Sequence, residues 1–175
     1  MDTTEQLEQI STQHGMRLLK SFVSATPFSP GRRPFFKYRD LGLEGASGGR
    51  MRAYQNNSIA GMTEPTGWHY HTCEMQFVYV LKGKLTIEFE DGTVATFTGG
   101  DSFFIPGGVR HNEIYVSEDK EALEVSVPGK IETVNVERPA GLPEKLKEVS
   151  NERPELHDEL ATQNLEGVPC ERCGR

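Results

Sequence analysis

The sequence predicts an all-β domain, an antiparallel sandwich or barrel, and three observations lead to this prediction. Between residues 35 and 136, strand-like segments of about six residues alternate with turn signals roughly every ten residues. All fifteen aromatic residues lie between Phe22 and Tyr115, so the residues that build a core are concentrated in this part of the chain. The chain also has 18 glycines and 10 prolines, which indicates many short segments joined by tight turns.

The N-terminal part, residues 1–34, is predicted to hold a short helix and a connector. Residues 1–20 are polar, and Leu7, Ile10 and Leu18 show weak helical spacing, which favours an amphipathic helix. Residues 27–34 contain three prolines and a glycine and therefore form the connector.

Residues 35–136 are predicted to form the barrel itself. Leu85, Ile87 and Phe89 alternate with polar residues, which is the period of a half-buried strand, and Asp91-Gly92 is then a hairpin signal. Further strands are expected on both sides of this hairpin. The expected strands cover residues 35–38, 51–55, 76–81, 85–89, 93–97, 102–105, 111–116 and 123–127.

Residues 137–175 are predicted to be a helical or irregular appendage that packs loosely or on a partner chain. This segment has no aromatic residue and is broken by prolines and glycines at six positions between 139 and 169, with short helices expected over residues 144–150 and 155–163. Cys170 and Cys173 form a Cys-x-x-Cys pair in it. We interpret the pair as part of an exposed tail, with half of a zinc site or a redox pair as the alternatives.

Composition and charge exclude several classes of function. The chain has 19 basic and 26 acidic residues and a formal charge of −7, which argues against nucleic-acid binding and against binding to an anionic membrane. No stretch approaches the roughly 20 apolar residues of a membrane span, and the first twenty residues lack the apolar core of a secretory signal. We therefore expect a cytoplasmic protein whose three cysteines are reduced.

Three of the five histidines have an arrangement that suits a metal ion. His69 and His71 are two residues apart, so on a strand both side chains point to the same face. His111 follows a Pro-Gly-Gly turn forty residues later and could reach the same point from a neighbouring strand. Three neutral imidazoles with coordination positions left over suit a first-row divalent metal. A lone His-x-His is common, so its surroundings decide the interpretation.

Those surroundings resemble the two motifs of the cupin superfamily. The first motif contains His69, His71, Gln76 and Gly83, and the second contains Gly100, Pro106, Gly108, His111 and Tyr115. The family also places a glycine six residues before the first histidine, where this chain has Thr63. The resemblance covers residues 61–115. It implies a double-stranded β-helix, or jelly-roll barrel, that holds one metal ion inside through His69, His71 and His111.

Two positions depart from the family pattern. The fourth ligand is usually glutamate, and here Gln76 occupies that position. Gln76 could bind the metal through its oxygen or hydrogen-bond a metal-bound water, whereas Glu74 could replace it if the loop is bulged. The last position of the second motif is usually asparagine, and here it is Tyr115.

The resemblance permits more than one chemistry. Cupins with three histidine ligands include thiol and diketone dioxygenases, so the leading prediction is a non-haem Fe(II) dioxygenase that acts on a small enolisable or anionic substrate. With Zn, Mn or Ni the alternative is an isomerase, cyclase or lyase that uses no oxygen. A non-enzymatic small-molecule-binding cupin is a third possibility.

Residues that could contact a substrate are Arg52, Tyr54, Trp68 and Tyr115. Arg52 could bind a carboxylate, although a surface salt bridge is the common role of such an arginine. Cys73 is interpreted as a small apolar filler rather than a reactive thiol. On the strand over residues 76–81, Val78 and Val80 should share the face of Gln76, with the aromatic residues opposite. Because the exposed sheet edges of short cupins are often covered by a second subunit, we expect a homodimer.

Overall fold

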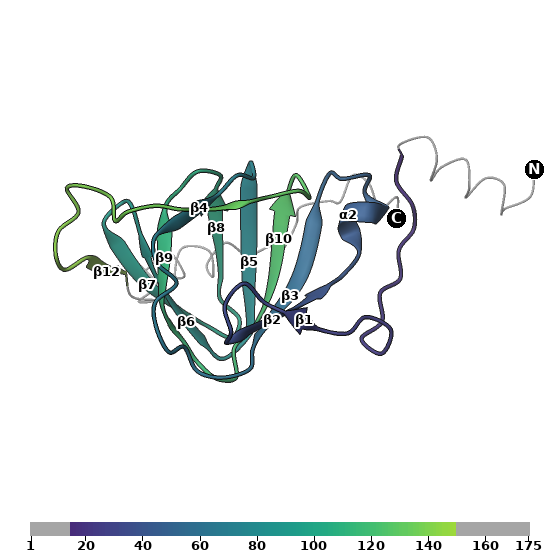
Figure 1. Cartoon of the computed structure of the whole chain (residues 1–175), viewed down its shortest axis with the longest axis horizontal. Coiled ribbons are helices and arrows are strands. Elements are labelled where there is room, and N and C mark those ends of the chain that lie inside the picture. The colour runs from purple at the N-terminus through teal and green to yellow at the C-terminus, as the bar shows by residue number, and fades with distance from the viewer. Residues whose placement is uncertain (1–14, 150–175) are drawn as a thin grey trace, which may run out of the picture.

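The computed structural model describes residues 15–149, and it consists almost entirely of β-strands (Figure 1). Two six-stranded sheets make up the domain. The first sheet contains, in spatial order, β1 (Ser29–Pro30), β2 (Phe36–Asp40), β3 (Arg52–Ser58), β10 (Glu121–Val127), β5 (Met75–Lys82) and β8 (Ser102–Pro106). The second contains β11 (Thr133–Asn135), β4 (His69–His71), β9 (His111–Val116), β6 (Lys84–Phe89), β7 (Thr93–Thr98) and β12 (Lys147–Val149). The one helix among residues 15–149 is α2, which is short (Leu43–Ala46).

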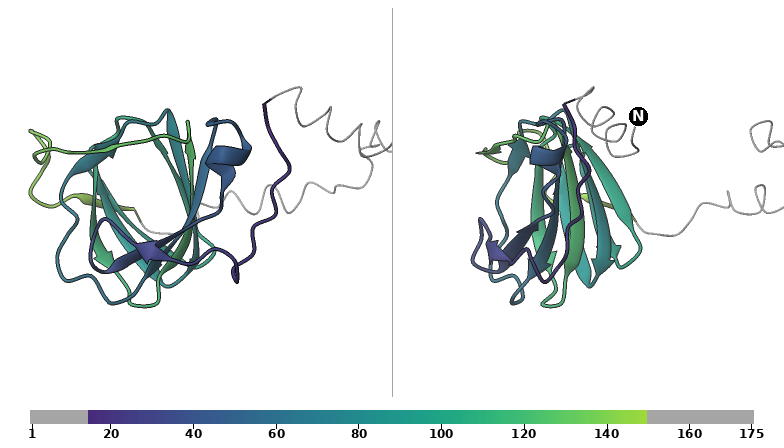
Figure 2. Two further views of the ribbon diagram at one scale, coloured as in Figure 1. Left: turned by 45° about the vertical axis from the view of Figure 1, so that its right-hand side comes forward. Right: turned by 90° about the vertical axis from the view of Figure 1, so that its right-hand side faces the viewer.

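The two sheets face each other and form the jelly-roll barrel that the sequence predicts (Figure 2). Strands that are adjacent in a sheet are mostly distant in sequence, because the chain crosses repeatedly from one sheet to the other. All pairings are antiparallel except that of β12 with β7. Such crossing connections bring His69 and His111 onto directly paired strands although forty-one positions separate them.

Apolar side chains from both sheets meet between the sheets. The core cluster contains Phe35, Phe36, Leu85, Ile87 and Val116. In β5 the exposure alternates strictly from residue 75 to 81, with Gln76, Val78 and Val80 buried and the intervening residues exposed. The predicted parity of this strand is therefore confirmed, and it places the Gln76 side chain inside the barrel.

The termini differ from the expectations at two places. The helix expected over residues 144–150 is wrong, because residues 147–149 form β12 and pair in parallel with β7. The outer edge of β7 offers unpaired backbone N–H and C=O groups. Residues 147–149 gain hydrogen bonds by pairing with this edge as a strand, which they would not gain as a short polar helix. Residues 15–20 of the expected N-terminal helix form a turn and an irregular segment, while residues 1–14 and the helix expected over 155–163 lie outside the described residues. Within residues 15–149, no helix is long and apolar enough to cross a membrane.

Candidate metal centre

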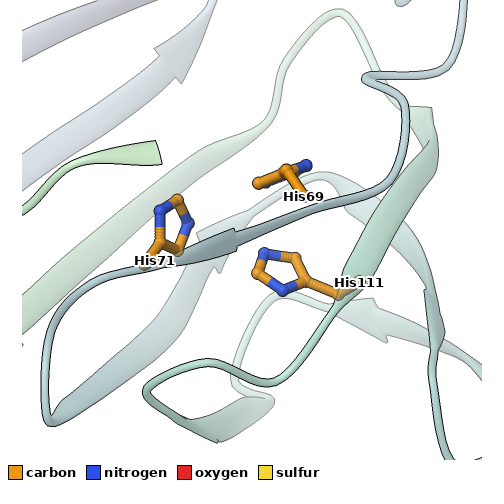
Figure 3. A group of neighbouring side chains, drawn as sticks. All are labelled: His69, His71 and His111. Carbon is orange, nitrogen blue, oxygen red and sulfur yellow. The ribbon is translucent and has the colours of Figure 1, made fainter. Parts of the chain in front are cut away.

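The three histidines singled out from the sequence lie together inside the barrel (Figure 3). His69 and His71 come from β4, where the two-residue spacing gives both side chains the same face, and His111 is the register partner of His69 on β9. The ring centroids of His69 and His111 are 4.4 Å apart, and each lies 5.2 Å from that of His71. One nitrogen from each ring lies within 4.8 Å of the others, so the group could hold a metal ion.

The other ring nitrogens are already occupied by hydrogen bonds. Nδ1 of His69 donates to the carbonyl oxygen of Gly67 (2.8 Å), and Nδ1 of His111 donates to that of Val109 (3.0 Å). Nδ1 of His71 lies 3.1 Å from the hydroxyl of Thr133. A carbonyl oxygen can only accept, so the proton of His69 and of His111 is on Nδ1 and the lone pair is on Nε2. These partners orient the rings in the way that metal-ligating histidines require.

Burial keeps the imidazoles of His69 and His71 neutral. It lowers the pKa of His71 to about 3, with a further lowering by the nearby His111 and His69. Burial also lowers the pKa of His69, against an opposing effect of Glu113. Only 1% of the surface of His69 and 2% of that of His111 are exposed. Neutral imidazoles are the form that binds a metal, so at neutral pH no proton has to leave His69 or His71 first.

Glu113 is a site residue that the sequence analysis missed. Its carboxylate oxygen Oε2 lies 3.8 Å from Nε2 of His69 and accepts a hydrogen bond from the hydroxyl of Thr66, a residue that is 1% exposed. Burial raises the pKa of Glu113, but the electrostatic effects of His69 and His111 and the hydrogen bond from Thr66 outweigh burial. The net pKa of Glu113 therefore lies below its usual range. The sequence signal that could have identified Glu113 is its position two residues after His111 on the same expected strand, because residues at this spacing point to the same face of a sheet.

The structure places the two candidates for the fourth ligand differently. Gln76 is 5% exposed and lines the cavity that contains the histidines. Glu74 is exposed and lies in the loop before β5, where its backbone nitrogen donates to Val127 and its carbonyl oxygen accepts from Gly107. Gln76 and Glu113 therefore line the cavity together with the histidines, whereas Glu74 does not.

The histidines open into a cavity of about 210 Å³ between the two sheets. Arg52 and Tyr54 line it from β3, with the guanidinium carbon of Arg52 4.5 Å from the centre of the Tyr54 ring. No carboxylate among residues 15–149 forms an ion pair with Arg52. The salt-bridge role is therefore absent from the described part of the chain, and the guanidinium is available to the cavity.

Trp68 and Tyr115 are not among the residues that line this cavity. Trp68 is buried at 7% exposure, whereas Tyr115 is 48% exposed and points away from the barrel. A bulge between β6 and β9 shifts the register, so that Thr86 faces Tyr115 and Ile87 faces Glu113. The extra residue reverses the alternation along β9, which turns Tyr115 outward and buries Val116 instead.

Comparison with known families agrees with this geometry. The family model described as a cupin domain matches residues 60–127, a segment that includes the three histidines, Gln76 and Glu113. This segment of the chain matches a cupin domain. The resemblance predicted from the two motifs is thereby confirmed. No curated protein matches the sequence.

Several solved structures share this cupin fold. The polyketide cyclase RemF from Streptomyces resistomycificus is 18% identical with a TM-score of 0.57, and the match covers 70% of this chain and 88% of RemF. An RmlC-like cupin from Shewanella frigidimarina is 20% identical with a TM-score of 0.51, covering 66% of this chain and 96% of that protein. The Fe(II) form of HppE is 13% identical with a TM-score of 0.51, and the match covers 62% of this chain and 60% of HppE. At these identities the likeness concerns the fold alone.

Cys73 takes no part in the candidate centre. Cys73 is buried at 7% exposure, and burial raises the pKa of its thiol, which fits the interpretation as an apolar filler. Cys170 and Cys173 lie outside the described residues.

Proposed function

We propose that this cupin is a small-molecule metalloenzyme, and that it is a non-haem Fe(II) dioxygenase acting on an enolisable or anionic substrate. The observation that carries the proposal is the group of three buried histidines whose Nδ1 atoms are engaged elsewhere. Their free nitrogens meet at the wall of a cavity large enough for a small molecule. An iron ion held there would supply dioxygen chemistry, and an Fe(II) form is known for the structural neighbour HppE.

The chain's own residues would bind and orient the substrate. His69, His71 and His111 would hold the ion, with Gln76 tuning or completing its sphere, and Arg52 can donate two parallel hydrogen bonds to a substrate carboxylate. Glu113, ionised and held by Thr66, is placed to accept a proton from an enolisable substrate that lies beside the histidines. Burial of the histidines excludes bulk water from the reacting end of the cavity.

A second candidate is a metal-assisted cyclase, isomerase or lyase that needs no oxygen. Glu113 favours it, because an ionised carboxylate beside a Lewis acid such as Zn(II) is the arrangement needed for proton transfer next to a carbonyl. The neighbour RemF is named as a polyketide cyclase.

The identity of the metal and the use of oxygen separate these candidates. Elemental analysis of protein purified without added metal is expected to find about one iron per chain. Fe(II)-loaded protein, screened with diketones, thiols and phenolic ketones, is expected to consume dioxygen and substrate in equal amounts, whereas the His71→Ala variant should consume neither. Tyr115→Phe, which changes an exposed side chain on β9, is the control and should behave as wild type.

The outcomes are distinct. Bound zinc together with substrate turnover in the absence of oxygen would replace the dioxygenase with the cyclase or isomerase. Ligand binding that never leads to turnover, and that persists in His71→Ala, would contradict both enzymes and leave a binding module.

A further inference from the structure

The cavity contains a buried amine that the proposed chemistry does not use. Lys120, just before β10, is 2% exposed and lines the same cavity as the histidines. Its Nζ donates to the backbone carbonyl oxygen of Asn56 (3.3 Å) and lies 4.5 Å from the centre of the Phe36 ring. Lysine is almost never buried to this extent unless a charged partner accompanies it.

No such partner is present in the described part of the chain. The ion pairs among residues 15–149 do not include Lys120, and its Nζ makes a single hydrogen bond although an ammonium group has three N–H donors. The carboxylates of Glu124 and Glu113 act on Lys120 only from beyond ion-pair distance. A buried cation whose donors are unsatisfied is costly unless another molecule completes its surroundings.

A second unsatisfied polar atom belongs to Asn56, the residue whose backbone carbonyl accepts from Lys120. Asn56 donates from its side-chain nitrogen to Glu124, which fixes the orientation of the amide, and its Oδ1 is buried without a partner. Asn56 is 4% exposed and lines the cavity. This end of the cavity therefore offers a charged donor and a neutral acceptor that the protein itself does not satisfy.

The register of the sheet separates this end from the histidine end. Asn56 is paired with Ala122, whereas Gln76 is paired with Ser126 four residues further along β10. At roughly 3.3 Å per residue this is about 13 Å along the strand. His71 leads into the loop before β5, and its carbonyl oxygen accepts from Gly108, so the histidines lie at the Gln76 end. The amine and the metal centre therefore line different ends of the same cavity.

The charge of the cavity suits an anion. Its lining contains four cationic side chains, Arg32, Arg33, Arg52 and Lys120, against two carboxylates, Glu113 and Glu124. The chain as a whole carries a formal charge of −7. A net positive interior in an acidic protein attracts a negatively charged ligand.

We propose that Lys120 binds an anionic group at the end of the substrate opposite to the one that meets the histidines. The substrate class is then a small molecule with chelating oxygens at one end and a carboxylate at the other. This inference rests on the proposed function for the chelating end only, because the contact with Lys120 requires no metal.

Binding of matched 2-oxo acids tests the proposal. The probes are oxaloacetate, 2-oxoglutarate and 2-oxoadipate, which end in a second carboxylate, and 2-oxobutanoate, 2-oxopentanoate and 2-oxohexanoate, which do not. Affinities are measured by calorimetry on the full chain, with and without Zn(II), because zinc supports no redox turnover. The variants are Lys120→Met, Lys120→Arg and, as the matched control, Lys82→Met, which removes a lysine that is 61% exposed.

At least one dicarboxylate is expected to bind wild type about tenfold or more tightly than its matched monocarboxylate. Lys120→Met should abolish that preference without weakening the monocarboxylate, Lys120→Arg should retain part of it, and Lys82→Met should leave it unchanged. No preference in wild type, or a preference that survives in Lys120→Met, would overturn the inference. If Zn(II) does not change the affinity for any probe while the preference for dicarboxylates remains, the result counts against the proposed metal function and not against the role of Lys120. Melting curves identify any variant that fails to fold, and Lys120→Arg then carries the test.

Discussion

Among single residues, Glu113 changes the interpretation of the site most. At the position where the family usually has a glutamate, this chain has Gln76, and an amide leaves a metal site one negative charge short. The structure places a carboxylate at another position, on β9, with Oε2 3.8 Å from Nε2 of His69. The negative charge missing from β5 is therefore present on β9, a strand of the other sheet, where Glu113 accepts a hydrogen bond from Thr66.

Glu113→Gln is expected to weaken metal binding by about ten- to a hundredfold, because it removes the negative charge beside His69 and keeps the size of the side chain. The measurement is competition for Zn(II) or Fe(II) with a chelating dye. Gln76→Glu combined with Glu113→Gln should recover part of the lost affinity. An affinity unchanged in Glu113→Gln would show that this carboxylate does not act on the ion.

Lys120 gives a second prediction at the residue scale. Burial lowers its pKa from 10.5 to about 8, so the charged amine destabilises the folded state. Lys120→Met should therefore raise the free energy of unfolding at pH 7 by about 3–4 kcal/mol, since a pKa unit corresponds to about 1.4 kcal/mol.

The pH dependence of this effect has a defined sign. Between pH 8 and 10.5 the unfolded chain holds the lysine proton more tightly than the folded chain does, so the stability of wild type rises with pH over this window. The advantage of Lys120→Met should accordingly shrink from pH 7 to pH 10 in urea titrations. If the difference in unfolding free energy between Lys120→Met and wild type stays constant from pH 7 to pH 10, the charge of the Lys120 amine is not the cause of that difference.

At the scale of elements, the turn between β8 and β9 fixes the loop between β4 and β5. Gly107 donates its N–H to the carbonyl of Glu74 (2.9 Å), and Gly108 donates to that of His71 (3.1 Å). A Cβ atom on Gly107 would lie 1.6 Å from the carbonyl oxygen of Cys73, so only glycine fits there. Gly107 and Gly108, which lie within the second motif, thus hold the loop that follows His71 of the first motif.

Gly107→Ala should lower the free energy of unfolding by about 2–4 kcal/mol and also weaken metal binding, because the loop that follows His71 must move. Chemical denaturation and the same dye competition measure the two effects. Gly61→Ala is the control, since its Cβ would meet only Glu118 Cγ at 3.4 Å. Wild-type stability in Gly107→Ala would contradict the close packing of the two loops.

At the scale of the whole molecule, the outer face of the first sheet is apolar. Phe77 and Tyr79 of β5 are each 38% exposed, Leu81 is 49% exposed, and Phe104, the register partner of Phe77 on β8, is 56% exposed. β8 is also the last strand of its sheet, so its outer backbone edge is unpaired within residues 15–149. An apolar face beside an open edge is typical of a surface that another chain covers.

The sequence predicts a homodimer. From the structure we expect that this apolar face is buried in the dimer. Light scattering on the full chain should give the mass of a dimer, and Phe77→Ser combined with Phe104→Ser should give that of a monomer. Tyr115→Ser, on the opposite sheet and 48% exposed, is the matched control and should remain dimeric. A monomeric wild type, or a double variant that stays dimeric, would contradict the prediction.

The sequence by itself determined the all-β class, the main strands and the group of three histidines. Period-two alternation, turn residues and motif spacing are local signals, and they identified β5, β6 and β9 within a few residues. The tertiary structure alone decided which donors share the cavity. A one-residue bulge turned Tyr115 outward, cross-sheet pairing brought Glu113 to His69, and an open edge of β7 made a strand of residues 147–149. These outcomes depend on register and on contacts between distant segments, to which the local periodicity of a sequence is not sensitive.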